Sequence, residues 1–142
     1  AVMVRIQLPE NPGLRRFLEF LRQHPVRIAL ASANEDAYDV VRSLGLEGSF
    51  REEHFVFTGH QLGAFGETLG RRMMNKQDLF EELMKRSGQR PEHVLGFEDS
   101  GHGIKAFQRL GITAIGIDME STREVDHADL VLHTFDELFT AR

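Results

Sequence analysis

The sequence predicts an α/β fold: a three-layer sandwich with a mainly parallel central sheet and helices on both faces. Two observations support this prediction. Short apolar runs alternate along the chain with stretches whose apolar residues recur at helical spacing. Several of these short runs are apolar throughout, which is typical of strands buried on both faces of a parallel sheet.

The first elements are a strand, a helix and a second strand. Val2–Leu8 is apolar and rich in β-branched residues, so we expect a strand there. A helix follows, with Asn11 as its cap and Pro12 at its first position. Val26–Ala31 is the next apolar strand. The apolar stripe of the first helix consists of Leu14, Phe17, Leu18 and Leu21.

The middle of the chain gives weaker signals. We expect a helix that is capped by Ser32 or Asn34 and ends at Gly45. His54–Thr58 is a short strand candidate, and the four glycines of Gly59–Gly70 indicate a loop. The apolar stripe of the expected helix consists of Ala37, Val40, Val41 and Leu44.

The last part of the chain is regular. Asn75 or Lys76 begins a helix that Gly88 ends, and a second helix runs from Gly101 to the stop at Gly111. Thr134 begins a capping-box sequence ahead of a final helix. The strands expected between these helices are Val94–Phe97, Ile112–Ile117 and Leu130–Leu132.

Composition restricts the class of protein. The chain has 142 residues, 41% of them hydrophobic, which suits one domain with its own core. Its net charge of −5 does not suit binding to nucleic acid or to an anionic membrane. The absence of cysteine excludes disulfide scaffolds, thiolate zinc sites and cysteine nucleophiles. No apolar run reaches transmembrane length and no signal-peptide pattern opens the chain, so we expect a cytoplasmic protein.

Polar residues follow several of the expected strands, and ligands of such sheets bind beyond the carboxyl ends of the strands. Ser32 and the amides of Ala33 and Asn34 offer a hydroxyl and free N–H groups, which suit a phosphate oxygen. If Ser32 and Asn34 are considered alone, simple helix capping by these two residues is the favoured interpretation. Lys76 is a cation at a helix start, where the dipole is already positive. That hints at phosphate or carboxylate binding, although a solvated surface lysine is simpler.

Glu98 and Asp99 are adjacent carboxylates directly after an apolar strand. Buried carboxylates are costly unless they are paired or bind a metal. Their hard oxygen atoms suit Mg²⁺, with water and a substrate phosphate as the remaining ligands. Alternatively, Asp99 or Ser100 caps the helix that begins at Gly101. These residues alone do not decide between the two interpretations.

Residues 94–106, centred on Glu98-Asp99-Ser100-Gly101, resemble the fourth motif of the haloacid dehalogenase-like (HAD) superfamily. Residues 29–34 resemble its second motif. The strand at residues 110–116, the ending at residues 128–138 and the Pro12–Leu14 segment are also similar to the family. The likeness is strongest to beta-phosphoglucomutase and phosphoglycolate phosphatase relatives, and it extends from Pro12 to the end of the chain.

The resemblance implies a HAD-like, Rossmann-type core that forms a single domain over residues 1–142, with the place of residues 1–13 left open and no cap domain. It also implies Mg²⁺-dependent phosphoryl transfer on a small phosphorylated metabolite, by a phosphohydrolase or a phosphomutase. Lys76-Gln77-Asp78 departs from the family's usual Lys-Pro-x-Pro-Asp. By position, the implied phosphate-binding residues are Ser32, Ala33, Asn34 and Lys76, and the implied Mg²⁺ ligands are Glu98 and Asp99.

The family's chemistry also requires an Asp-x-Asp motif after the first strand. Its first Asp attacks phosphorus and its second acts as acid and base. Glu10 is the single carboxylate among residues 1–13. The nearest match, Asp118–Thr122, follows a different strand, and we interpret it as a strand-end turn. We therefore expect this chain alone to be catalytically deficient.

In the family, the strand that carries this motif lies in the middle of the sheet, and its loss would leave unpaired strand edges. We hypothesise that Val2–Leu8 occupies or partly fills this central position, which would put Glu10 and Asn11 where the nucleophile belongs. An incompletely filled sheet would favour a homo-oligomer or a complementing segment.

Three interpretations of the whole chain stay open. In the first, the chain is the C-terminal part of a phosphatase or phosphomutase, which a start at Ala1 favours. In the second, it is a short member of the family that lost the nucleophile and serves as an inactive binding or interaction module. In the third, it is a receiver-type domain phosphorylated on Asp99. The last is disfavoured, because Asp118 follows Ile117 where a receiver has a lysine.

Overall fold

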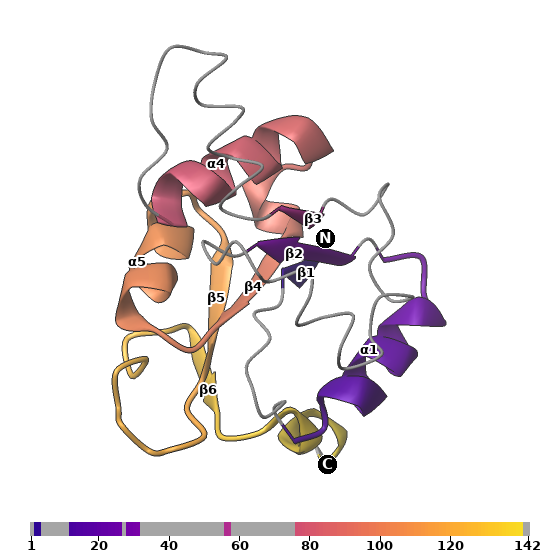
Figure 1. Cartoon of the computed structure of the whole chain (residues 1–142), viewed down its shortest axis with the longest axis vertical. Helices are drawn as coiled ribbons and strands as arrows, with labels where there is room; N and C mark the ends of the chain where they lie inside the picture. The colour runs from indigo at the N-terminus through magenta and orange to yellow at the C-terminus, as the bar shows by residue number, and fades with distance from the viewer. Residues whose placement is uncertain (1, 4–11, 27, 32–55, 58–75, 141–142) are drawn as a thin grey trace.

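The computed structural model describes residues 2–3, 12–26, 28–31, 56–57 and 76–140. Within these ranges the strands form one sheet in the order β3-β2-β1-β4-β5-β6, and every neighbouring pair is parallel (Figure 1). This confirms the expected parallel α/β sheet. The strands are β1 (Val2–Met3), β2 (Ile28–Ala31), β3 (Val56–Phe57), β4 (Leu95–Glu98), β5 (Thr113–Ile117) and β6 (Leu130–Leu132).

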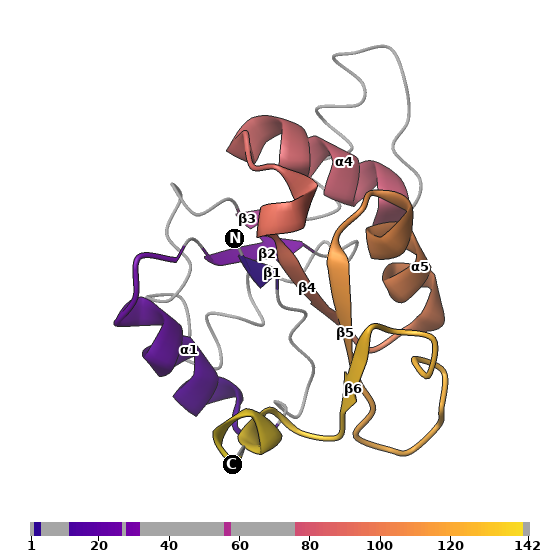
Figure 2. The same cartoon turned by 180° about the vertical axis from the view of Figure 1, so that it is seen from behind.

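Helices cover both faces of the sheet. Helix α1 (Leu14–Arg22) and the 3₁₀ helix η4 (Phe135–Phe139) lie on one face. Helices α4 (Lys76–Ser87) and α5 (Gly101–Arg109) lie on the other, as Figures 1 and 2 show from opposite sides. A short 3₁₀ helix, η3 (Pro91–His93), leads into β4. No helix in the described ranges combines the length and hydrophobicity that crossing a bilayer requires.

Alternation along the strands divides the buried residues into two clusters. On β5, Ile115 belongs to the cluster under α1, and Ala114 belongs to the cluster under α4 and α5. Aromatic rings fill both clusters. The ring centroids of Phe17 and Phe97 lie 5.1 Å apart on the α1 side, and those of Phe80 and Phe107 lie 4.1 Å apart on the other side. The sheet is therefore covered on both faces, as its apolar strands predict.

The hypothesis about the first strand is confirmed for the residues that the structure describes. Val2 pairs with Ile28 of β2 and with Leu95 of β4, so β1 lies in the middle of the sheet. Glu10 and Asn11 lie outside the described residues. The expected helix that ends at Gly45, the Gly59–Gly70 loop and most of residues 50–58 also lie outside them.

Two helix ends differ from the prediction. Helix α1 begins at Leu14 after Gly13, so the proposed cap at Asn11 and the start at Pro12 are wrong. Gly13 has a φ of 82° and packs so closely on Asp136 of η4 that a side chain would not fit there. This tertiary contact fixes the turn.

The C-terminal helix is also different, because it is a 3₁₀ helix without a capping box. The side chain of Thr134 makes no cap hydrogen bond. Glu137 instead accepts a hydrogen bond from the backbone N–H of His133 at 3.1 Å.

Candidate functional site

The order of the strands marks one place on the sheet edge. From β1 the chain builds outward through β2 to β3, and it then returns to the other side of β1 to add β4, β5 and β6. The order therefore reverses between β1 and β4. In open parallel sheets, ligands bind at such a reversal, beyond the carboxyl ends of the strands. Glu98 is the last residue of β4 and Asp99 follows it, so both carboxylates stand at this place.

Glu98 is a buried carboxylate whose Oε1 atom is fixed by hydrogen bonds. Only 3% of the residue is exposed. Its Oε1 atom accepts hydrogen bonds from the backbone N–H of Asp99 at 3.1 Å and from the backbone N–H and the hydroxyl of Ser100, both at 3.2 Å. Charge-assisted hydrogen bonds of this kind offset the cost of burying a carboxylate. They also fix its orientation at the start of α5.

Ser100 begins helix α5. Its backbone is extended, and its hydroxyl accepts a hydrogen bond from the N–H of Gly103 at 3.2 Å. Of the two capping candidates, Ser100 is therefore the cap. Asp99 is half-buried. His102, in the first turn of α5, is exposed.

The first turn of α5 packs directly on the Glu98 side chain. A Cβ atom on Gly103 would lie 2.1 Å from Cγ of Glu98 and 2.5 Å from its Oε2. Real atoms do not approach so closely, so a larger residue at this position would force the Glu98 side chain to move. The sequence Glu-Asp-Ser-Gly-His-Gly thus builds a turn that holds two carboxylates at the end of a buried strand.

The donor set at this turn fits a hard divalent cation. Mg²⁺ prefers carboxylate oxygens and keeps several water or phosphate ligands, so two carboxylates suffice on the protein side. The described residues contain no group of three or more acidic or histidine side chains that would form a complete cage.

Of the predicted phosphate-binding residues, the structure describes the backbone of Lys76 but not the segment that follows β2. Ser32, Ala33 and Asn34 lie outside the described residues; they follow β2, the neighbour of β1. Lys76 is the first residue of α4. The next residue, Gln77, accepts a hydrogen bond from Arg109, the last residue of α5, at 3.4 Å.

Glu98 and Asp99 precede the first residue of α5, at the opposite end of that helix from Arg109. The structure therefore does not bring the backbone at Lys76 next to the two carboxylates.

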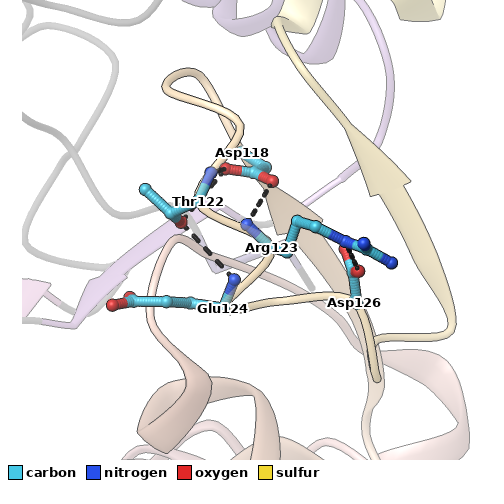
Figure 3. A network of polar contacts seen from close by, with 5 residues as sticks. All are labelled: Asp118, Thr122, Arg123, Glu124 and Asp126. Carbon is cyan, nitrogen blue, oxygen red and sulfur yellow. Dashed lines mark hydrogen bonds and ion pairs between the residues drawn. The ribbon is translucent and has the colours of Figure 1, made fainter.

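Asp118 follows β5 and is the polar residue that sequence reasoning undervalued. It is 5% exposed, and its carboxylate holds the next loop, as Figure 3 shows. Its Oδ1 accepts hydrogen bonds from the N–H of Thr122 at 2.8 Å and from its hydroxyl at 3.3 Å, and its Oδ2 accepts from the N–H of Arg123 at 3.0 Å. The interpretation of this segment as a strand-end turn is confirmed. An Asp after a strand with Thr four residues later was the available signal.

Two pKa values shift at this turn. Burial by itself would raise the pKa of Asp118, but the N–H groups of Arg123 and Thr122, the Thr122 hydroxyl and the charge of His133 together lower it. Nδ1 of His133 lies 2.9 Å from the backbone oxygen of Asp118. This hydrogen bond is the main cause that raises the pKa of His133, against the opposing effect of burial. Glu137, Asp118 and Asp126 add to it by their negative charge.

Comparison of the sequence with known proteins gives two matches. A family model described as haloacid dehalogenase-like hydrolase matches residues 2–111. The chain is also 30% identical over 110 residues to a curated "Phosphorylated carbohydrates phosphatase" from Thermotoga maritima, which covers 76% of this chain and 46% of that protein.

Solved structures share the fold. A beta-phosphoglucomutase from Clostridium difficile superposes with a TM-score of 0.72 at 23% identity, over 91% of this chain and 52% of the other. The HAD-hydrolase YfnB from Bacillus subtilis, bound to magnesium, superposes with a TM-score of 0.72 at 18% identity, over 92% of this chain and 54% of the other. The chain thus spans about half the length of the proteins it matches.

Proposed function

The chain belongs to the haloacid dehalogenase-like hydrolase family, and from that premise we propose that it binds Mg²⁺ and the phosphate of a small phosphorylated metabolite at a phosphoryl-transfer site. In this proposal, residues 1–142 form one core domain. The observation that carries the proposal is the position of Glu98 and Asp99 where the strand order reverses beside β1.

Glu98 and Asp99 are the residues that would hold the metal. Glu98 is buried and fixed by the start of α5, so it offers a preorganised ligand, and Asp99 is half-buried beside it. When bound there, Mg²⁺ would offset negative charge on the phosphate oxygens. The magnesium in the similar Bacillus subtilis structure supports this choice of ion.

The phosphate side of the proposal rests on the family motifs. Ser32, with the backbone amides of Ala33 and Asn34, would bind phosphate oxygens after β2. By the same resemblance, Lys76 would contribute positive charge at the phosphate. A phosphorylated carbohydrate is the substrate class we propose, on the strength of the name of the Thermotoga maritima relative.

The proposal separates ligand binding from turnover. The segment that follows β1, residues 4–11, contains Glu10 as its single carboxylate and has no Asp-x-Asp motif. The family's reaction needs an aspartate that attacks phosphorus and a second one that transfers protons. We therefore expect the chain by itself to bind Mg²⁺ and phosphate without catalysing phosphoryl transfer.

The test compares the wild-type chain with Asp99→Asn in two assays. In the first, a hexose phosphate is titrated with Mg²⁺ present while the amide resonances of residues 98–103 are followed. We expect shifts in the wild type that Asp99→Asn removes. Glu92→Gln, in η3 at the other end of β4, is the matched control and should behave like the wild type.

In the second assay, release of inorganic phosphate from the same hexose phosphate is measured with and without Mg²⁺. We expect no Mg²⁺-dependent release from either variant. Turnover that depends on Mg²⁺ and that Asp99→Asn abolishes would show that the chain has a nucleophile, and it would overturn the separation of binding from turnover.

A further inference from the structure

The loop between β5 and β6 packs against the turn that carries the two candidate metal ligands. A Cβ atom on Gly101, the first residue of α5, would lie 3.1 Å from the backbone oxygen of Glu124 and 3.5 Å from Cε1 of His127. The side-chain amide of Gln108 donates a hydrogen bond to the backbone oxygen of His127 at 2.8 Å. The loop therefore contacts α5 at its first turn and again near its end.

The same loop is anchored in the sheet beside Glu98. Val125 is 1% exposed and belongs to the cluster under α4 and α5. It occupies the space above Gly116, where an added Cβ atom would lie 2.6 Å from Cβ of Val125. Gly116 is the pairing partner of Glu98 in the β4–β5 ladder. Val125 and the Glu98 side chain thus lie over neighbouring positions on the same face of the sheet.

Asp118 determines the course of this loop. Ser121 and Arg123 both have positive φ angles, 54° and 66°, which residues other than glycine rarely adopt. The N–H groups of Thr122 and Arg123 point to the Asp118 carboxylate (Figure 3). The Thr122 hydroxyl in turn accepts from the N–H of Glu124 at 3.4 Å. A strained loop of this kind keeps its shape only where surrounding contacts fix it.

We propose that Asp118 is a positioning residue for the Glu98–Asp99 metal site. Through Thr122 and Glu124 it holds the loop against Gly101, and the loop holds the first turn of α5 on the Glu98 side chain. The inference rests on the proposed function, because the metal gives these two carboxylates their role. Asp118 acts through the loop and is not itself a metal ligand.

The experiment is amide hydrogen exchange on the metal-free full chain, comparing wild type with Asp118→Asn. We expect exchange at the amides of Asp99, Ser100 and Gly103 to accelerate about tenfold or more, because the loop no longer braces that turn. Asp129→Asn is the matched control. Its carboxylate accepts the N–H of Ala114 at 2.7 Å, near the other end of β5, so it should change these amides by less than about twofold.

A second readout is the affinity for Mn²⁺, used as a probe for Mg²⁺. Asp118→Asn should weaken it by about tenfold, since outer residues that orient metal ligands have effects of this size. Asp129→Asn should leave it unchanged. Thr122→Val, at an exposed position, replaces the hydroxyl with a methyl group and should shift both readouts in the same direction by a smaller factor.

The outcomes separate the two claims. Unchanged exchange at the three amides in Asp118→Asn would overturn the positioning role. So would equal acceleration at α1 on the opposite face, because that would show only a general loss of stability. If the wild type does not bind Mn²⁺ but the local acceleration is observed, the proposed metal function fails while the bracing contact stands.

Discussion

Glu98 does two things at the end of β4. It satisfies the first backbone N–H groups of the turn into α5, and it presents a fixed carboxylate at the edge where the strand order reverses. From sequence alone, metal binding and helix capping were competing explanations for this segment. The structure assigns the cap to Ser100, and Glu98 and Asp99 stand beside it at the sheet edge where the strand order reverses.

At this scale the close contact between Gly103 and Glu98 gives a direct prediction. Gly103→Ala should lower the free energy of unfolding by about 1–3 kcal/mol, because the new methyl group overlaps the Glu98 side chain and that side chain must move. Urea denaturation measures the change. His102→Ala, at the exposed neighbouring position, should stay within about 0.5 kcal/mol of the wild type. Equal stability of Gly103→Ala and the wild type would show that the contact is not close.

At the scale of elements, the sequence predicts most of what local pattern controls. The stripe of α1 is buried at Leu14, Phe17, Leu18 and Leu21, as expected. The wrong predictions concern helix ends. The start of α1 depends on the packing of Gly13 against Asp136, more than a hundred residues later in the sequence, and no local rule contains that contact.

The junction of β5, β6 and the intervening loop should respond to pH through His133. The hydrogen bond to the Asp118 backbone oxygen, with nearby negative charge, raises the pKa of His133 above its ordinary value of 6.5. A raised pKa in the folded state contributes stability that is fully present below pH 6.5 and is lost as pH rises through the folded-state pKa.

We therefore expect His133→Gln to lower Tm more at about pH 5.5 than at about pH 8.5. Thermal unfolding at the two pH values measures this. A loss for His133→Gln that does not depend on pH would contradict the assignment.

At the scale of the whole molecule, the position of β1 creates the reversal of strand order at which the candidate site lies. A two-residue pairing of Val2 and Met3 with β2 and β4 places the first strand at the centre of the sheet. The sequence predicts this position, because an empty centre would leave unpaired strand edges. It could not predict how α4 lies on α5, and that packing separates the start of α4 from Glu98 and Asp99.

The central claim is that Glu98 and Asp99 bind a divalent cation where the strand order reverses. The most direct measurement is a Mn²⁺ titration of the wild-type chain, monitored by paramagnetic broadening of its amide resonances. We predict saturable broadening centred on residues 98–103 that Mg²⁺ reverses by competition, that Asp99→Asn abolishes and that Glu92→Gln preserves. Broadening that is absent at residues 98–103, or that is the same in Asp99→Asn, would contradict the account.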